Sequence, residues 1–373
     1  MTLGIDASRA NRDHRTGTEW YSWHLIEELK KIIPEEIQVV LYTNEKLTAE
    51  LGVVPKNWQE KILAWPPKYL WTQIRLWWEL FLNPPDALLV PAHTIPFLPI
   101  RKKIKVFITV HDVGFKRFPE LYKPIQVWYH DLTMKKIKSR ADVIITDSQF
   151  SREEIIHFYR VDSQKIKVIY LGYDKNKYRQ MVDRVDILNK YKIVQPYLLY
   201  LGRLEKKKNI GNLVKAFALA RMQHDDLRLV LAGRAGNQYA DIKKIISVLQ
   251  LEREIILPGY IATDDLPIVI SQAEIFLFPT LYEGFGLPIL EAMACATPVI
   301  TSNLAPHTEV AGRAAVLVDP HNPQQIADKI SAILTDPDLK RQLQAGGLEQ
   351  VKQFSWDRMA QGVWQLIKSG GLC

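Results

Sequence analysis

The sequence predicts an α/β protein with two doubly wound, Rossmann-like parallel sheets, each wrapped by helices. Short apolar segments of strand length alternate along the chain with longer segments of helical spacing. This alternation fades near residue 171 and starts again at residue 197, which indicates two domains. The length of 373 residues also exceeds that of one ordinary domain, and the 47% hydrophobic and 24% charged content is typical of a globular protein.

The first half is expected to form one sheet, and a polar stretch joins it to the second half. Apolar runs predict strands at 3–7, 38–42, 87–90, 106–110 and 143–146, and Trp23, Ile26 and Leu29 recur at helical spacing within 19–32. The polar segment 171–195 is interpreted as a linker. The expected domains are therefore 1–175 and 190–355.

The second half repeats the alternation. Strands are expected at 197–201, 228–232, 255–257, 275–278, 299–301 and 315–318, with helices near 210–221 and 240–249. Ligands of open parallel sheets bind beyond the carboxyl ends of the strands. Loops that follow these strands are therefore the first places to look for a site.

The cysteine count and the N-terminus favour a cytoplasmic protein. The chain has two cysteines, Cys295 and Cys373, which argues against a disulfide framework. No signal peptide is recognisable, because Asp6 interrupts the first apolar residues. No uncharged apolar run reaches the roughly 18 residues that a membrane-spanning helix needs.

Positive charge is concentrated in one window. Between Arg101 and Arg140 there are eleven Lys or Arg and three Asp or Glu, an excess equal to the net charge of +8 of the whole chain. Such a surface suits an anionic lipid or a phosphate-bearing acceptor. A solvated basic face is the alternative. Nucleic acid is not expected as a partner, because no nucleic-acid-binding motif accompanies the charge.

The most informative loop is EGFGLPILE at 283–291, which follows the predicted strand at 275–278. Pro288 suits the start of a helix, and Gly284 and Gly286 allow a tight backbone path before it. The N–H groups of Phe285, Gly286 and Leu287 would then form an anion site at the positive end of the helix dipole. Glu283 and Glu291 flank this site, so hydroxyls on either side of an anion could be bound, as in a nucleotide-sugar diphosphate.

Three other loops follow predicted strands. Arg203 and Lys208 lie before a helix and could neutralise a diphosphate. A basic loop that only caps the preceding strand is an equally good interpretation, and the acidic Glu205 between them does not favour phosphate binding. His111 ends the strand at 106–110, where it is either functional or a hydrogen-bonded structural residue. In the loop 12–19, Gly17 could let backbone amides approach a phosphate, or could mark a simple turn.

These residues carry a resemblance to the retaining GT-B glycosyltransferases called family 4, over nearly the whole chain. The strongest part is 283–303 with the preceding segments 259–261, 266–267, 271–274 and 278–280; the segments 202–203, 208–209, 110–112, 115–120 and 147–151 also fit. The chain departs from the family at Gly17-Thr18, at 305–310 and at 312–315. The last two departures leave the donor open.

The resemblance implies roles for the site residues. Glu283 would bind the donor sugar and Glu291 the ribose, while Arg203 and Lys208 would bind the diphosphate. Backbone amides at Gly284, Phe285, Gly286, Leu287 and Gly17 would help them, Tyr260 would border the base and His111 would lie near the sugar. The domain 1–175 would bind the acceptor and 190–355 the nucleotide sugar. The tail 356–373, with Trp356, Met359, Val363, Trp364 and Ile367 at helical spacing, would cross back to the first domain.

A metal is not expected. The one Asp-x-Asp spacing in a loop, Asp336-Pro337-Asp338, is typical of a turn and helix cap. Fixed cations and aligned amides can stabilise a departing diphosphate in its place. We therefore expect no cofactor, with the nucleotide sugar as donor substrate.

The segment 65–81 is unusually aromatic. Trp71, Ile74, Trp78 and Phe81 would share one helical face, with Trp77 beside it. Tryptophan with flanking Lys or Arg suits a membrane interface, and a helix packed on the first domain is the alternative. Together with the basic residues between Arg101 and Arg140, the membrane interpretation suggests contact with the inner face of the membrane.

The expected function is retaining, metal-independent transfer of a hexosyl group from a nucleotide sugar to a glycan or lipid-linked acceptor. Similarity to bacterial mannosyltransferases of surface polysaccharide assembly favours GDP-mannose, and UDP-hexoses stay open. A sugar-nucleotide epimerase or phosphorylase on the same fold is one alternative. A sugar- or lipid-binding protein without catalytic activity is another.

Overall fold

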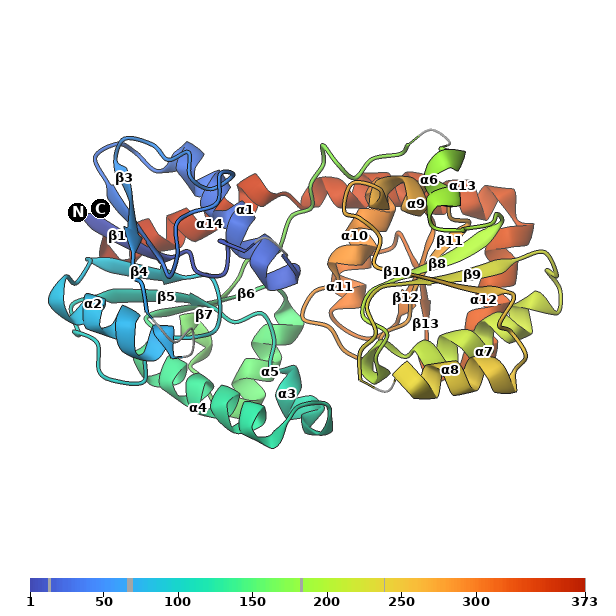
Figure 1. The fold of residues 1–373 in the computed structure, drawn as a ribbon, viewed down its shortest axis with the longest axis horizontal. Coiled ribbons are helices and arrows are strands. Elements are labelled where there is room, and N and C mark those ends of the chain that lie inside the picture. The colour runs from blue at the N-terminus through green and yellow to red at the C-terminus, as the bar shows by residue number, and fades with distance from the viewer. Residues whose placement is uncertain (13–14, 66–69, 182–183, 238, 373) are drawn as a thin grey trace. The chain divides into compact units, whose positions relative to one another are not determined.

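The computed structural model describes residues 1–12, 15–65, 70–181, 184–237 and 239–372. They form two compact units, Met1–Gly172 with Trp356–Cys373 and Tyr173–Ser355. Each unit contains one sheet in which all paired strands are parallel (Figure 1). The predicted α/β class with two parallel sheets is therefore confirmed.

The described residues of the first unit form a seven-stranded sheet in the order β3-β2-β1-β4-β5-β6-β7. Its strands are β1 (Thr2–Asp6), β2 (Gln38–Thr43), β3 (Trp58–Ile62), β4 (Ala87–Val90), β5 (Lys105–Thr109), β6 (Val143–Thr146) and β7 (Ile166–Val168). The sequence analysis missed the two edge strands. In β3 only Trp58 is buried, and β7 has three residues, so neither carries an apolar run of strand length.

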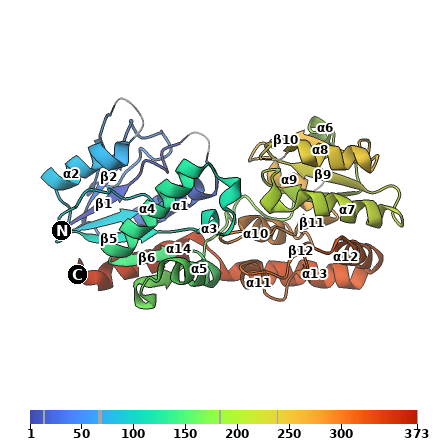
Figure 2. The same ribbon diagram turned by 90° about the horizontal axis from the view of Figure 1, so that it is seen from below.

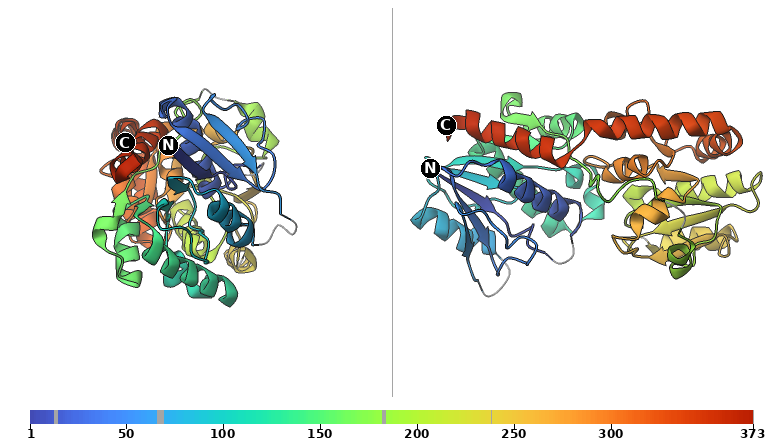
Figure 3. Two further views of the ribbon diagram at one scale, coloured as in Figure 1. Left: turned by 90° about the vertical axis from the view of Figure 1, so that its left-hand side faces the viewer. Right: turned by 90° about the horizontal axis from the view of Figure 1, so that it is seen from above.

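Helices cover this sheet. They are α1 (Gly17–Ile32), α2 (Trp77–Leu82), α3 (Gly114–Arg117), α4 (Pro124–Arg140), α5 (Gln149–Tyr159) and α14 (Trp356–Ile367), with short 3-10 or π turns at Thr72–Leu76, Pro119–Leu121, Ser163–Lys165 and Lys368–Leu372. The C-terminal α14 packs against α1 (Figure 3), and α4 packs against α5 (Figure 2). The five tail residues at helical spacing are all buried, and the Trp356 ring stacks on His24 at 4.4 Å.

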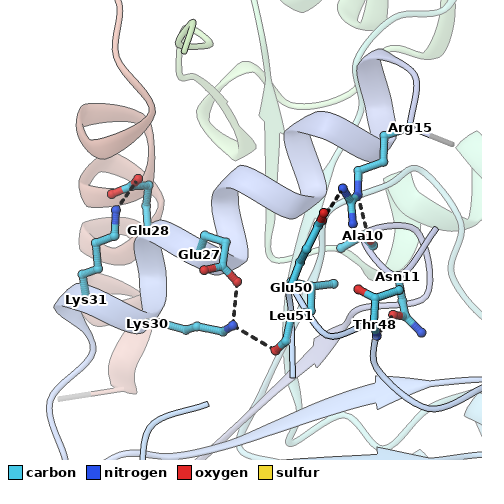
Figure 4. A network of polar contacts seen from close by, with 10 residues as sticks. All are labelled: Ala10, Asn11, Arg15, Glu27, Glu28, Lys30, Lys31, Thr48, Glu50 and Leu51. Atoms are coloured by element: carbon cyan, nitrogen blue, oxygen red, sulfur yellow. Dashed lines mark hydrogen bonds and ion pairs between the residues drawn. The ribbon is translucent and has the colours of Figure 1, made fainter. Parts of the chain in front are cut away.

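Polar contacts fix α1 to the loops around it (Figure 4). The Arg15 guanidinium donates to the Ala10 carbonyl at 3.2 Å and pairs with Glu50 at 2.7 Å. One turn from the other end of the helix, Lys30 pairs with Glu27 at 2.6 Å and donates to the Leu51 carbonyl at 3.0 Å. The Arg15 contacts therefore fix the segment just before α1, and the Lys30–Leu51 contact ties the last turn of α1 to the loop at Leu51.

The described residues of the second unit form a six-stranded sheet in the order β10-β9-β8-β11-β12-β13. Its strands are β8 (Tyr197–Leu201), β9 (Arg228–Ala232), β10 (Ile255–Gly259), β11 (Ile275–Phe278), β12 (Val299–Ser302) and β13 (Val316–Val318). Every predicted strand of this half is present. The helices are α6 (Val185–Lys190), α7 (Ile210–Arg221), α8 (Tyr239–Val248), α9 (Leu266–Ser271), α10 (Leu287–Ala294), α11 (His307–Ala311), α12 (Pro323–Thr335) and α13 (Pro337–Gln350), with 3-10 turns at Lys206–Lys208 and Val351–Gln353.

The stretch 171–195, interpreted as a polar linker, has structure of its own. It contains α6, and its lysines pair with the loop before α9: Lys177 with Asp264 at 3.0 Å and Lys190 with Asp265 at 2.6 Å. The polar composition that suggested a linker therefore belongs to a segment that is ion-paired to the second unit.

The order of strands brings particular loops together. In the second sheet β8 lies next to β11, and the chain runs outward from this pair in opposite directions. In the first sheet β1 and β4 form the equivalent pair. The crevice at the carboxyl ends of such a pair is the usual ligand site of an open parallel sheet.

Candidate active site

Lys208 and Glu283 meet at the carboxyl ends of β8 and β11. The Lys208 ammonium forms an ion pair with Glu283 Oε1, and its nitrogen lies 5.9 Å from the centre of the Phe278 ring. Only 13% of the Lys208 side chain and 16% of the Glu283 side chain are exposed. The structure thus brings together a cation and a carboxylate that the sequence analysis placed in separate loops.

Arg203 lies in the same loop as Lys208, with its side chain exposed. Among the described residues it has no carboxylate partner, whereas its backbone is held by a hydrogen bond from the Tyr200 hydroxyl to the Arg203 carbonyl at 3.2 Å. Glu205 faces Lys207, 3.6 Å away, and not the two predicted phosphate ligands. The acidic residue in this loop therefore leaves Arg203 available for an anion.

The glycine loop leads directly into α10, as predicted. Gly286 precedes the helix with φ of 111°, in the region that favours glycine, and Pro288 lies in its first turn. The Phe285 side chain is buried and packs edge-on against Phe354 at 5.9 Å, which anchors the loop. The first N–H groups of an α-helix have no acceptor within the helix, and they carry its positive dipole end.

Two buried residues that the sequence analysis missed support this loop. His307 Nε2 and the Thr280 hydroxyl are 3.0 Å apart, and burial lowers the pKa of His307 to about 4, so its ring is neutral near pH 7. Asn209 donates to the Pro279 carbonyl at 3.0 Å and to the Pro320 carbonyl at 2.6 Å. Their partners lie 27 to 111 residues away along the chain, so these contacts could not be predicted from the local sequence.

Glu291 lies one turn into α10 and is half-buried. Burial raises its pKa to about 7, although a hydrogen bond with Tyr178 acts in the opposite direction. Tyr178 comes from the segment that was interpreted as a linker. The predicted ribose ligand is therefore a carboxyl group that is held by a phenol and that ionises near neutral pH.

Tyr260 follows β10 and is 57% exposed. The Arg234 guanidinium lies 5.2 Å from its ring centre, and its hydroxyl is 3.1 Å from the Thr263 hydroxyl. These two contacts orient the Tyr260 ring, and an exposed aromatic ring is suited to stacking with a base. Tyr260, Arg203, Lys208, Glu283, the loop 284–287 and Glu291 all belong to the second unit.

His111 and Gly17 belong to the first unit. His111 Nδ1 lies 2.6 Å from Asp147 Oδ2, and Nε2 lies 3.3 Å from the Pro91 carbonyl. Burial opposes protonation of this ring, but the charge of Asp147 and its hydrogen bond outweigh burial and raise the pKa of His111. Asp147 follows β6, the neighbour of β5, and the sequence analysis gave it no such role.

Gly17 is the first residue of α1. The N–H of Thr16, just before the helix, is capped by Glu19 at 3.1 Å. Among the described residues nothing lies within 4 Å of a Cβ placed at position 17, so no close approach demands glycine there. Asp13 and His14 of this loop lie outside the described residues.

A metal site is not apparent in the described part of the chain, where no three His, Cys, Asp or Glu side chains converge in a way that could hold an ion. Asp336 caps α13, accepting hydrogen bonds from the N–H groups of Asp338 and Leu339 at 3.0 Å each. The interpretation of this Asp-x-Asp segment as a helix cap is confirmed.

Two family models match the chain and together cover most of it. Residues 15–177 match Glycosyltransferase Family 4, and residues 183–350 match Glycosyl transferases group 1. A mannosyltransferase of Escherichia coli, O-antigen chain mannosyltransferase B, is 34% identical over 264 residues, 70% of this chain and 69% of that protein. The chain belongs to this glycosyltransferase family. The resemblance inferred from the motifs is thereby confirmed.

Other relatives of this glycosyltransferase are similar over a comparable length. O-antigen chain mannosyltransferase RfbU of Salmonella typhimurium is 28% identical over 73% of this chain and 70% of its own. The serotype-specific mannosyltransferase WbdA of Escherichia coli is 31% identical over 75% of this chain, which spans 35% of that longer protein.

Solved structures share the fold. Sucrose-phosphate synthase from Thermosynechococcus elongatus superposes with a TM-score of 0.74 at 21% identity, over 99% of this chain and 98% of its own. Anabaena HepE, in complex with UDP and glucose, gives 0.72 at 18% identity over 99% of both chains. The fold is that of the GT-B glycosyltransferases, and the protein is a glycosyltransferase.

Proposed function

We propose that this glycosyltransferase moves a mannosyl group from GDP-mannose to a glycan or lipid-linked acceptor, with retention of anomeric configuration and without a divalent metal. The observation that carries the proposal is the Lys208–Glu283 pair beside the glycine loop that opens α10. The names of the relatives support mannose. A UDP-hexose is the second candidate, because a structural neighbour binds UDP.

The chemistry of the site follows from its charges. Cleavage of a glycosyl phosphate bond builds negative charge on the departing diphosphate and positive charge on the sugar. Arg203, Lys208 and the first N–H groups of α10 stabilise the diphosphate. When Lys208 turns to phosphate, Glu283 is released to accept hydrogen bonds from sugar hydroxyls. Glu291 binds the ribose and His111 the sugar, as the family resemblance implies.

The donor is tested by thermal stabilisation with GDP-mannose, UDP-glucose and their nucleotides, since bound ligand raises apparent stability. We expect GDP-mannose to stabilise most. Transfer is then followed by NMR of the anomeric proton of the product, with and without EDTA. An inverted product, or activity that EDTA abolishes and Mg²⁺ or Mn²⁺ restores, contradicts the proposal. Conversion of the nucleotide sugar alone to an epimer would favour the epimerase alternative.

We also propose that an exposed aromatic patch, composed of Ile74, Trp78, Phe81, Leu82 and Leu98, contacts an anionic membrane. Each of these side chains is 40% to 51% exposed. The Arg101 guanidinium lies 5.4 Å from the Phe81 ring, and Arg101, Lys102 and Lys103 have no carboxylate partner among the described residues. Apolar rings next to unpaired cations complement an interface of anionic lipid.

The prediction that Trp71 shares a helical face with Ile74, Trp78 and Phe81 is wrong. Trp71 is buried and donates from Nε1 to the Leu63 carbonyl at 2.7 Å, because the segment Thr72–Leu76 is a π-helix and its wider turn rotates Trp71 into the core. Residues 66–69 of the aromatic segment lie outside the described residues. In the described part of the chain, no helix is both long and apolar enough to span a bilayer.

Flotation with vesicles tests the membrane contact. At low salt the protein should float with phosphatidylglycerol-containing vesicles and not with phosphatidylcholine alone. Replacing Trp78 and Phe81 by serine should reduce flotation, and Val53→Ser, at an exposed apolar residue far along the chain, should not. Wild-type protein that stays at the bottom with anionic vesicles at low salt would end this hypothesis.

A further inference from the structure

A tyrosine from the segment 171–195 reaches into the candidate site of the second unit. Tyr178 belongs to that unit, its side chain is 8% exposed, and its hydroxyl forms a hydrogen bond with the Glu291 carboxylate on α10. Burial and the charge of Glu291 both raise the pKa of Tyr178, so the phenol stays protonated and acts as the donor of this bond. A residue that the sequence analysis placed in a linker is therefore bonded directly to the predicted ribose ligand.

The backbone around Tyr178 is fixed on both sides. Before it, a turn is closed by the Tyr178 N–H, which donates to the Asp174 carbonyl at 2.8 Å. After it, Ser271 at the end of α9 accepts from the Met181 N–H at 3.1 Å and donates to the Arg179 carbonyl at 3.4 Å. The position of the phenol is thus set by its own turn and by α9.

The same segment is tied to α10 one turn beyond Glu291. Cys295 follows the last residue of α10 and forms hydrogen bonds with the Ser271 side chain and the Arg179 backbone. Burial raises the pKa of Cys295 to about 12, so this residue contributes a thiol and no charge near pH 7. Glu291 and Tyr178 therefore lie on two segments that are themselves bonded together, which limits the orientations open to the carboxylate.

Few other groups act on Glu291. Burial raises its pKa to about 7, and the hydrogen bond from Tyr178 and the charge of Lys177 oppose burial. Helices α9, α11 and α13 also pack on α10, and among their described residues no charged side chain shifts this pKa. In the described part of the chain, Tyr178 is the one side chain whose hydrogen bond favours the ionised form of Glu291.

A carboxylate that binds a ribose must accept hydrogen bonds from its hydroxyls. An ionised carboxylate has about four acceptor positions on its two oxygens, so one bond from Tyr178 leaves room for two hydroxyls. In a protonated carboxyl group one oxygen becomes a donor, and fewer acceptors are left for a diol. Tyr178 therefore opposes the loss of acceptors that burial of Glu291 alone would cause.

We propose that Tyr178 is a positioning residue of the donor site, whose hydroxyl orients the Glu291 carboxylate for the 2′- and 3′-hydroxyls of the ribose. This inference rests on the proposed function. It gives the segment 171–195 a role in donor binding that does not depend on the base or on the transferred sugar, because Glu291 is assigned to the ribose. Tyr178 acts through Glu291 and not by contact with the donor.

Nucleotides with and without ribose hydroxyls test this role in the full chain. By calorimetry at pH 8, Tyr178→Phe should weaken GDP binding about tenfold, as loss of a hydrogen bond to a charged group predicts. Its affinity for 2′,3′-dideoxy-GDP should stay within about twofold of the wild type, because that ligand lacks the hydroxyls that Glu291 binds. Equal weakening of both nucleotides, or no weakening of either, overturns the proposal.

Tyr197→Phe is the matched control. It removes another buried phenol of the same unit, one that donates to the Val269 carbonyl at 2.6 Å and lies at the start of β8, away from the carboxyl end of that strand. This variant should bind both nucleotides as the wild type does. A ribose-dependent loss in Tyr197→Phe would mean that any lost phenol has this effect, and the assignment of Tyr178 would be wrong.

The pH dependence gives a second readout, which a phenol that only fills space would not change. The ratio of GDP affinity to dideoxy-GDP affinity cancels the titration of the phosphate and reports on Glu291. In the wild type this ratio should fall as pH drops through about 7, where the carboxylate takes up a proton. In Tyr178→Phe the midpoint should move to higher pH, because a bond that favours the ionised form is lost. An unmoved midpoint contradicts the proposal.

These measurements separate this inference from the proposed function. If the wild type binds UDP and not GDP, the proposed donor is wrong, and Tyr178→Phe must then weaken UDP and not its dideoxy form. If the wild type binds GDP and dideoxy-GDP equally, the proposed diphosphate site stands and the inference fails. If neither GDP nor UDP binds, both proposals are wrong. Ser271→Ala releases the segment that carries Tyr178 and must show the same ribose-dependent loss even if Tyr178→Phe does not fold.

Discussion

Replacing Lys208 by alanine should lower the rate of glycosyl transfer by about 10²–10³, the usual effect of losing one preorganised group that stabilises charge in the transition state. Its ammonium is largely buried beside Glu283, in a site where water screens charge poorly. The change removes a cation from the diphosphate and leaves the Glu283 carboxylate without its partner. Both effects should appear in kcat of transfer and in donor hydrolysis.

Lys206→Ala is the matched control, because it removes the same charge from the same short turn at an exposed position. It should retain nearly wild-type activity. Glu283→Gln should lose transfer to a similar degree as Lys208→Ala but keep the affinity for GDP, since the glutamine still leaves Lys208 for the phosphates. Equal loss in Lys206→Ala would mean that only the overall charge of the turn matters, and the assignment of Lys208 would be wrong.

The position of Lys208 shows what the sequence could predict. Its loop and the glycine loop were each recognisable as following a strand, and ligands gather at the carboxyl ends of parallel strands. The order of strands, with β8 beside β11, was not predictable from local patterns, because 73 residues and two other strands separate Leu201 from Ile275 in the chain. Only that order makes Lys208 and Glu283 neighbours.

Residues that act through tertiary contacts were the ones missed. Asp147 and His307 lie in segments that the resemblance compares, but their partners His111 and Thr280 lie 36 and 27 residues away in the sequence, so their contacts could not be predicted. The aromatic segment failed for a different reason, since a π-helical turn changes the spacing on which a helical face is read. Backbone irregularity of this kind leaves no mark in residue composition.

Replacing Asp147 by asparagine should lower transfer about 10- to 100-fold and move its alkaline limit to lower pH. His111 lies between two acceptors, a carboxylate on Nδ1 and the Pro91 carbonyl on Nε2, so only the doubly protonated ring can donate to both. Without the charge of Asp147, burial is opposed only by Asp112 and the Pro91 carbonyl, so the pKa of His111 should fall. The asparagine N–H can then donate to Nδ1 of a neutral ring while Nε2–H donates to the Pro91 carbonyl, so the variant favours the neutral form of His111.

The sign of the pH effect follows from the raised pKa. The protonated ring contributes to stability and, in this proposal, to activity at low pH, and both are lost as pH rises through the pKa of the folded protein. Asp112 also favours the charged ring and is unchanged in the variant.

The midpoint is measured from the pH dependence of kcat and from the NMR titration of the His111 Cε1 proton. Thr109→Val removes the neighbouring hydrogen bond with Tyr21 but no charge, so it should leave the midpoint in place. If Asp147→Asn and Thr109→Val titrate alike, Asp147 only fills space and does not set the proton on His111.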